Sequence, residues 1–232
     1  MRTEAIAATL RKTELFSGLS DDTVTRIAER TVPRRYGKGQ PVVLEGDAGE
    51  SMFVVAEGGL KLTVLSPDGD EMVLTTFGPG DSFGELSMLD GGRRSASAYA
   101  TEPSTLLALT RSTVLDLVAE DRALADRLFA RLGGLVRRLT GQAADLVFLD
   151  LDGRVAKALS DLAARHGEPS GEEIVVDLSL TQSDLAQMVG GSRQSVNQIL
   201  KAFEGDGLVS MRRRRIVVHD LEALERRARS VG

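Results

Sequence analysis

The sequence predicts an α+β protein in which a small jelly-roll-like β-roll, a long helix and a winged helical domain follow one another. Short β-rich runs separated by glycines fill residues 32–110, and leucines then recur at heptad spacing as far as residue 149. A helix–glycine turn–helix pattern followed by a β-hairpin occupies the C-terminal part. These observations place the three parts at residues 1–112, 113–150 and 151–232.

Composition limits the classes of function. With 232 residues, 42% hydrophobic and 27% charged, the chain can form two ordinary domains. It has no apolar run of about 18 to 20 residues and no signal peptide, so we expect a cytoplasmic protein without a membrane partner. The absence of cysteine excludes disulfides, thiolate metal sites and iron–sulfur clusters. The two histidines, His166 and His219, lie far apart, and we expect surface positions and no metal site.

Charge is distributed unevenly along the chain. The net charge is −5, yet residues 181–232 contain nine Lys and Arg against six Asp and Glu. An acidic N-terminal part and a basic C-terminal part indicate that only the C-terminal part contacts phosphate.

The N-terminal part begins with helical signals and continues with strands. Residues 1–30 are expected to form short helices, one of which starts at Ser20-Asp21-Asp22. Glycine-rich turns separate the β-runs, and Ser66-Pro67-Asp68-Gly69 is a typical hairpin turn. Short strands at this spacing predict a small sandwich or barrel. The runs are residues 41–44, 52–55, 60–65, 72–77 and 105–109.

From Thr113 the pattern becomes helical. Apolar residues alternate in steps of four and three, with Gln142 as the single polar member, and this favours a two-stranded coiled coil that joins two copies of the chain. The alternative is an amphipathic helix lying on its own β-domain. Asp150 to Gly153 then breaks the helix as a candidate hinge, before a further helix from about Arg154 to Arg165. The expected dimer interface is Leu128, Leu132, Leu135, Leu139, Gln142, Leu146 and Leu149.

The pattern after residue 180 predicts a helix-turn-helix. Thr181 and Asp184 have the spacing of a capping box, and Gly190-Gly191 form a turn before Ser192 caps a second helix. In that helix Val196, Ile199, Leu200 and Phe203 form the buried stripe, which leaves polar and basic residues on the opposite face. Such residue types read base edges and phosphates in the major groove.

Four consecutive arginines, residues 212–215, lie between two β-runs and predict a hairpin wing with a cationic tip. The alternative is a solvated charge run, which the position directly after a recognition helix disfavours. The expected DNA-contacting residues are Thr181, Gln182, Ser183, Ser192, Arg193, Gln194, Ser195, Asn197, Gln198, Lys201, Arg212, Arg213 and Arg214.

The segment from Phe83 to Ala96 suits a phosphate and a sugar. Gly84 allows a close approach of the backbone, and Glu85 can accept from a ribose hydroxyl. Arg94 can clamp a phosphate with help from Ser95. The alternative is a surface loop with an Arg–Glu ion pair.

These segments carry a family resemblance. The motifs are Phe83-Gly84-Glu85-Leu86-Ser87 followed by Arg94-Ser95-Ala96, Phe148-Leu149-Asp150 with Gly153-Arg154-Val155-Ala156, and Leu180-Thr181-Gln182 followed by Gly190-Gly191-Ser192-Arg193. In this order the chain, from about Leu15 to its C-terminus, resembles the family of the cyclic-AMP receptor protein (catabolite activator) and the fumarate–nitrate regulator.

The resemblance is strongest to the cyclic-AMP branch, and it implies a homodimeric, sequence-specific DNA-binding transcription regulator. The N-terminal β-roll would be a cyclic-nucleotide-binding domain, with cyclic AMP as allosteric effector and no permanently bound cofactor. Partners would be a second copy, palindromic double-stranded operator DNA and RNA polymerase. The sequence shows no nucleophile–base pair, so no enzymatic activity is expected. A cyclic-nucleotide-regulated enzyme or a pure interaction module is the alternative from another class, and the winged helix with its arginine tip argues against it.

The resemblance also implies which residues meet the nucleotide. Gly84, Glu85 and Leu86 would hold the ribose and phosphate side, and Arg94 and Ser95 the phosphate. Members of the branch place two hydroxyl-bearing residues against the adenine, where this chain has Leu139 and Thr140, so only Thr140 keeps the hydroxyl. This departure leaves open a same-fold regulator that uses cyclic GMP, another ligand or none, while the missing cysteines exclude iron–sulfur sensing. The full expected ligand set is Leu62, Leu74, Thr75, Phe83, Gly84, Glu85, Leu86, Ser87, Arg94, Ser95, Ala96, Leu139 and Thr140.

The recognition helix departs from the family as well. Relatives present Arg-Glu at its start and a second Arg one turn later, whereas this chain has Arg193-Gln194 and then Gln198. Arg193 suits guanine, but Gln194 suits adenine better than cytosine, so we expect an altered operator half-site.

The expected mechanism is a population shift in which the nucleotide, between the β-roll and the long helix near Thr140, extends or re-registers the coiled coil. The DNA-binding domains would then turn about the hinge and enter major grooves about 34 Å apart.

Overall fold

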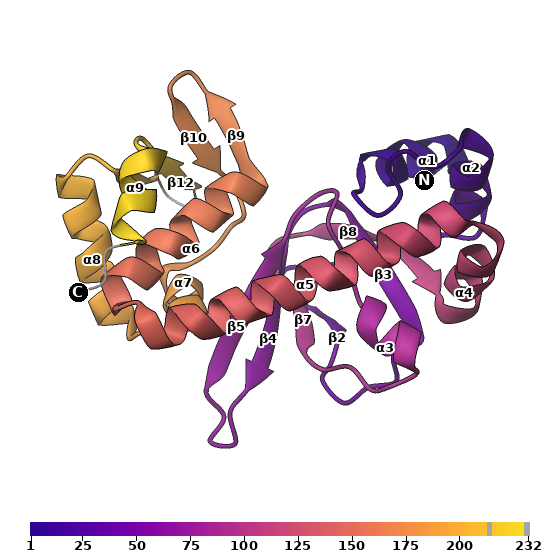
Figure 1. Ribbon diagram of the computed structural model, residues 1–232, viewed down its shortest axis with the longest axis horizontal. Coiled ribbons are helices and arrows are strands. Elements are labelled where there is room, and N and C mark those ends of the chain that lie inside the picture. Colours follow the sequence, from indigo (N-terminus) through magenta and orange to yellow (C-terminus); the bar gives the residue numbers. More distant parts are fainter. Residues whose placement is uncertain (213–214, 230–232) are drawn as a thin grey trace. The chain divides into compact units, whose positions relative to one another are not determined.

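The computed structural model describes residues 1–212 and 215–229, and the chain divides into two compact units. The first unit comprises Met1–Val64 and Thr76–Arg137, and the second Leu65–Thr75 and Arg138–Gly232. Figure 1 traces the helices and strands along the chain, which confirm the predicted α+β class. Within the part of the chain described, no helix combines the length and apolar character needed to cross a membrane.

The first unit opens with two short helices, α1 (Thr3–Lys12) and α2 (Asp21–Glu29). The Ser20 side chain caps α2 by accepting a hydrogen bond from the backbone N–H of Thr23 at 3.1 Å. The predicted helical start at residues 20–22 is thereby confirmed.

Two four-stranded antiparallel sheets follow, which confirms the predicted sandwich. One has the order β1-β8-β3-β6 and the other β2-β7-β4-β5. The β-rich runs predicted from sequence all form strands, whereas β1, β6 and β7 went unrecognised. Strand β1 contains a proline and two arginines and lies at a sheet edge, where the N–H that proline lacks is not needed for pairing. The strands are β1 (Val32–Tyr36), β2 (Pro41–Val43), β3 (Ser51–Glu57), β4 (Leu60–Leu65), β5 (Glu71–Phe77), β6 (Ser82–Phe83), β7 (Ser97–Ala100) and β8 (Ser104–Thr110).

Strands β3 and β8 are buried on both faces. Met52 and Val54 belong to a core shared with the helices, while Phe53 and Val55 belong to a second core shared with the other sheet. Because successive side chains point to opposite faces, a strand covered on both sides becomes a continuous apolar run. This explains the uninterrupted apolar runs in the sequence.

The helical region after residue 110 consists of two helices, α4 (Arg111–Glu120) and α5 (Arg122–Phe148). The expected single helix from Thr113 is therefore corrected. Asp121 has extended backbone angles, and its side chain accepts a hydrogen bond from the backbone N–H of Ala123 at 2.9 Å. An aspartate that caps the second helix in this way ends the first one.

The second unit contains α6 (Leu151–His166), capped by Asp150, whose Oδ1 accepts from the N–H of Gly153 at 2.8 Å. A helix break over residues 150–153 was expected, but α6 starts at Leu151 rather than at Arg154, so Gly153 lies within the helix. The unit continues with α7, α8 and α9 around a sheet of order β11-β12-β10-β9. The bounds are β9 (Gly167–Ser170), β10 (Glu173–Val176), α7 (Gln182–Val189), α8 (Arg193–Gly205), β11 (Val209–Arg212), β12 (Arg215–Val218) and α9 (Leu221–Arg227).

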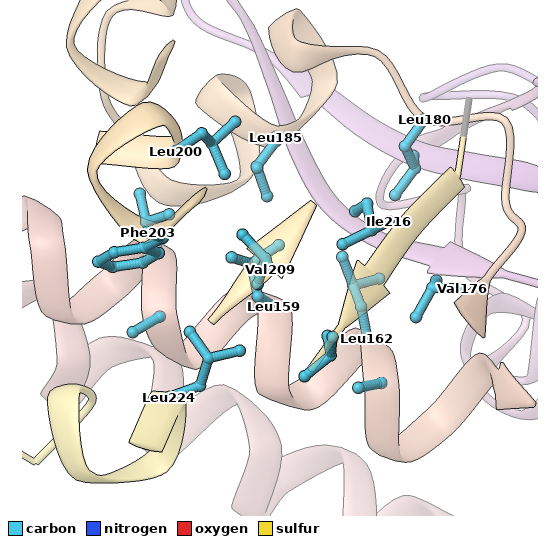
Figure 2. Close-up of a cluster of buried hydrophobic side chains, with 14 of the residues drawn as sticks. Leu159, Leu162, Val176, Leu180, Leu185, Leu200, Phe203, Val209, Ile216 and Leu224 are labelled. Atoms are coloured by element: carbon cyan, nitrogen blue, oxygen red, sulfur yellow. The ribbon is translucent and has the colours of Figure 1, made fainter. Parts of the chain in front are cut away.

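One hydrophobic core holds this second unit together. Figure 2 shows Leu159 of α6, Phe203 of α8, Val209 of β11 and Ile216 of β12 gathered in it. Phe203 is fully buried, as the predicted stripe of the second helix requires. Burial of this stripe fixes which face of α8 remains at the surface.

Candidate functional site

The turn between β6 and the short helix α3 (Glu85–Asp90) is built around Gly84. Its φ of 89° is left-handed, and a Cβ there would lie 2.7 Å from Nη1 of Arg94. Only glycine combines this backbone angle with so close an approach of another side chain. Gly84 therefore allows the Arg94 side chain to lie against the start of α3.

Backbone hydrogen bonds fix the position of Arg94, and its side chain is buried. The N–H of Arg94 donates to the carbonyl of Asp47 at 2.8 Å, and its own carbonyl accepts from the N–H of Gly46 at 2.9 Å. The Arg94 side chain is only 6% exposed. Its Nη1 donates to the carbonyl of Gly84 at 3.1 Å and to Oγ of Ser87 at 2.9 Å, and Nη2 donates to the carbonyl of Ser51.

The Arg94 guanidinium is buried beside aromatic rings as well as polar groups. It lies 6.0 Å from the centre of the Phe53 ring, which stacks on Phe83. Burial lowers the pKa of Arg94, and the carboxylates of Asp47 and Glu85 oppose that shift. Within the described part of the chain, Nε of Arg94 is buried and has no hydrogen-bond partner. A buried guanidinium with an unused donor is suited to an anionic ligand.

Glu85 does not pair with Arg94 but with Arg131 of α5. Nε of Arg131 lies 2.9 Å from Oε1 of Glu85, and Nη2 donates to the carbonyl of Ser82. Leu124, Leu128 and Arg131 recur on one face of α5, and the two leucines are buried in the first unit's core. Arg131 was not among the expected site residues, because no local motif marks it. The signal that could have identified it is its place on the inward face of the helix.

The remaining expected ligand residues are dispersed. Ser87 and Ala96 are buried, whereas Leu86 and Ser95 are exposed. Leu62 packs against the core between the sheets. The others belong to the second unit. There Thr75 accepts a hydrogen bond from Nη1 of Arg165 at 2.9 Å, and the Leu74 carbonyl accepts from Nε2 of Gln142 at 3.3 Å. Leu139 and Thr140 are exposed on α5.

Helix α5 presents an exposed apolar stripe. Phe129 and Val136 are 71% and 63% exposed, and Leu139 and Leu146 lie at the next heptad positions of the same stripe. Leu128, by contrast, is buried in the core of its own unit. The exposed stripe shares Leu132, Leu139 and Leu146 with the expected interface. At the other heptad position it uses Phe129 and Val136 in place of Leu128 and Leu135, one residue further along the helix. Leu132, Leu135 and Leu149 are partly buried, and Gln142 is exposed.

The helix-turn-helix forms as the sequence predicts. The Thr181 hydroxyl and Asp184 carboxylate make the reciprocal capping box, and Gly190 ends α7 with a φ of 65°. Ser192 caps α8 by accepting from the N–H of Ser195 at 3.0 Å. This leaves Arg193, Gln194, Gln198 and Lys201 exposed on α8.

Two further expected DNA contacts are bonded to each other. Nδ2 of Asn197 donates to Oε1 of Gln182 at 2.8 Å, which joins the start of α7 to the exposed side of α8. Thr181 is exposed, and Gln182 and Ser183 are partly buried. The structure therefore gathers the expected residues from both helices on one region of the second unit.

The wing forms between β11 and β12, which pair in antiparallel register with Arg212 opposite Arg215. Both arginines are exposed. Arg213 and Arg214 lie outside the described residues.

Comparisons with known proteins agree with this arrangement. The cyclic nucleotide-binding domain family matches residues 33–121, and the Crp-like helix-turn-helix domain family matches residues 153–227. The chain is 34% identical over 220 residues to the CRP-like cAMP-activated global transcriptional regulator of Mycobacterium tuberculosis, covering 95% of this chain and 98% of that protein. It is 32% identical over 216 residues to the cyclic AMP receptor protein of Thermus thermophilus, covering 93% and 97%.

The fold matches solved structures as well. The structure of FixK2 from Bradyrhizobium japonicum superposes with a TM-score of 0.78 at 21% identity, covering 87% of this chain and 99% of that one. Sequence, fold and matched domains therefore agree: the chain belongs to the CRP family of DNA-binding transcription regulators that carry a cyclic nucleotide-binding domain.

Proposed function

We propose that this protein is a homodimeric transcription regulator whose sequence-specific binding to a palindromic operator is controlled by cyclic AMP. Residues 1–112 would bind the nucleotide, residues 113–150 would join the subunits and residues 151–232 would bind DNA. The observation that supports the proposal most directly is Arg94, which is buried and charged beside Gly84 and whose Nε has no hydrogen-bond partner among the residues described.

The residues around Arg94 suit a cyclic phosphate joined to a ribose. The guanidinium would neutralise the phosphate charge, and Ser87 and two backbone carbonyls already hold it in one orientation. Glu85 would accept from the ribose hydroxyl. The named relatives are cAMP-activated or cyclic AMP receptors, which supports the same effector here.

The Glu85–Arg131 ion pair offers a route from nucleotide to helix. A ribose hydroxyl that donates to Glu85 would share this carboxylate with Arg131, and Arg131 belongs to the helix proposed to join the subunits. The nucleotide would then favour one position of α5 over another. Such a difference in affinity between two conformations is what a population shift requires.

The apolar stripe on α5 supports pairing with a second copy. A heptad row of large exposed apolar side chains on one helix is costly in water and is covered when two such helices form a coiled coil. Phe129 and Val136 extend the interface expected from sequence, and Leu128 would contribute to the core instead.

A second candidate function is a same-fold regulator that answers to cyclic GMP, another ligand or none. The observation in its favour is Leu139, which carries no hydroxyl at a position where the resemblance implies one.

Selection from random DNA tests the proposal. The purified protein is offered a randomised duplex pool with cyclic AMP, with cyclic GMP and without nucleotide, and the bound fractions are sequenced. We expect a palindromic site enriched with cyclic AMP alone. Equal enrichment in all three arms would favour the second candidate, and no enrichment in any arm would contradict DNA regulation.

A further inference from the structure

The outer face of the wing sheet carries an unusual concentration of charge. Arg212 of β11 lies directly opposite Arg215 of β12, and like charges in such a pair repel. Val176 of the neighbouring strand β10 pairs with Ile216, so Asp177 follows at the position beside Arg215. The side chain of Asp177, directly after this third strand, thereby reaches Arg215.

Asp177 binds Arg215 closely. Nε and Nη2 of Arg215 each lie 2.7 Å from Oδ2 of Asp177. Among the described residues, the carboxylate that faces Arg212 is more distant, with Nη2 of Arg212 3.8 Å from Oε1 of Glu173. Glu173 is shared, because Nδ1 of His219 lies 3.0 Å from the same oxygen. Of these two wing arginines, Arg215 is the one held by a carboxylate at hydrogen-bond distance.

A carboxylate and a phosphate compete for the same guanidinium donors. Both accept charge-assisted N–H bonds, so Arg215 has to exchange Asp177 for a phosphate when it contacts DNA. The pair is exposed, with side chains 61% and 49% accessible, so a phosphate can displace the carboxylate. Asp177 also places a negative charge where the wing would approach the DNA backbone.

We propose that Asp177 competes with DNA phosphate for Arg215 and thereby limits non-specific DNA binding. This rests on the proposed function, in that the winged helix binds DNA. A duplex bound loosely through its general charge leaves Arg215 on Asp177. An operator held in register by α8 presents a phosphate at a fixed place, and the exchange then becomes favourable. Asp177 is on this account a specificity-determining residue that does not itself contact a base.

A purely structural role for Asp177 leads to a different result. If the carboxylate only relieved the repulsion between Arg212 and Arg215, its removal would loosen the wing and weaken DNA binding. Competition instead predicts tighter binding, and only while Arg215 is present.

The experiment measures binding to a short random-sequence duplex by fluorescence anisotropy over a series of salt concentrations. Asp177→Asn is compared with the wild type and with Glu222→Gln. The control removes the same charge from the same unit, but at a residue that pairs with Arg226 on α9 rather than with the wing. Arg215→Ala, alone and combined with Asp177→Asn, completes a double-mutant cycle. Thermal melting confirms that each variant folds, and Asp177→Ser replaces the Asn variant if that one loses its transition.

We expect Asp177→Asn to steepen the plot of log affinity against log salt by about one unit, because one more phosphate is neutralised. If the variant and the wild type bind DNA equally at 1 M salt, this steeper slope makes the variant bind about eight-fold more tightly at 0.1 M salt. Glu222→Gln should leave the slope unchanged, and the gain should vanish in the Arg215→Ala background.

Weaker binding by Asp177→Asn, a gain equal to that of Glu222→Gln, or a gain that persists without Arg215 would overturn the inference. A wild-type protein that binds no DNA, with or without cyclic AMP, would instead contradict the proposed function.

Discussion

Arg131 of helix α5 forms an ion pair with Glu85 at the start of α3, with Nε and Oε1 2.9 Å apart and side chains only 19% and 9% exposed. These residues are far apart in sequence, and their contact joins the expected sugar site to the long helix. The pair therefore links the chemistry of ligand binding to the element proposed to transmit it.

Replacement of Arg131 should destabilise the first unit. Arg131→Gln leaves the buried Glu85 carboxylate without its ion-pair partner, which costs about 3 kcal/mol in the free energy of unfolding. Urea denaturation measures this loss. The double variant Arg131→Gln/Glu85→Gln should recover much of it, because the buried charge is gone. A double variant less stable than Arg131→Gln would contradict the ion pair as described.

Replacement of Gly84 should damage both folding and ligand binding. Gly84→Ala meets a left-handed φ of 89°, which costs about 1–2 kcal/mol, and its Cβ also collides with Arg94. Gly69→Ala is a matched control, because Gly69 has the same φ with no atom within 4 Å of the added Cβ. Calorimetry with cyclic AMP should show weakened binding for Gly84→Ala alone. Equal affinities of the two variants would show that the close approach to Arg94 is unimportant.

Polar substitution on the exposed stripe of α5 should weaken the dimer. Leu139→Gln removes an apolar contact from the proposed coiled coil and should raise the dissociation constant at least ten-fold, since a lost core contact costs more than about 1.4 kcal/mol. Sedimentation equilibrium measures this change. Ala144→Gln adds the same side chain at an exposed position off the stripe and should leave the dimer intact. Dissociation by the control, or none by Leu139→Gln, would count against the proposed interface.

The recognition helix should select an unusual half-site. Gln194 offers an amide that pairs with adenine, whereas a carboxylate there would accept from cytosine. Parallel selections from random DNA with the wild type and Gln194→Glu should differ at one base position of each half-site, with adenine giving way to cytosine. Identical consensus sites would show that Gln194 does not read a base.

The parts of the fold that depend on local chemistry were predictable from sequence. The Thr181–Asp184 capping box, the Ser192 cap and the buried stripe ending at Phe203 each lie within a few residues and follow known helix rules. The break at Asp121 was missed because leucine periodicity continues across it, and a single side-chain cap decides the boundary. Strand β7 (Ser97–Ala100) contains Tyr99 as its single strong β-former among Ser and Ala, and it forms because β2 and β4 pair with it on either side.

The candidate site shows the same division. The Gly84-Glu85 turn and Arg94 lie within one short motif, so sequence alone could associate them. The partner of Glu85 could not be assigned in that way, because Arg131 reaches it only through the packing of α5 against the first unit's core. The pairing of Arg215 with Asp177 likewise depends on strand register, which a charge run does not reveal.

The most direct test of cyclic-nucleotide control is calorimetric titration of the purified protein with cyclic AMP and cyclic GMP. Arg94→Gln is compared with Arg93→Gln, its exposed neighbour, after thermal melting has shown that both variants fold. We expect cyclic AMP to bind with a dissociation constant of about 1 μM or tighter to the wild type and to Arg93→Gln, and we expect this binding to be lost in Arg94→Gln. Failure of the wild type to bind either nucleotide, or undiminished binding by Arg94→Gln, would contradict this expectation.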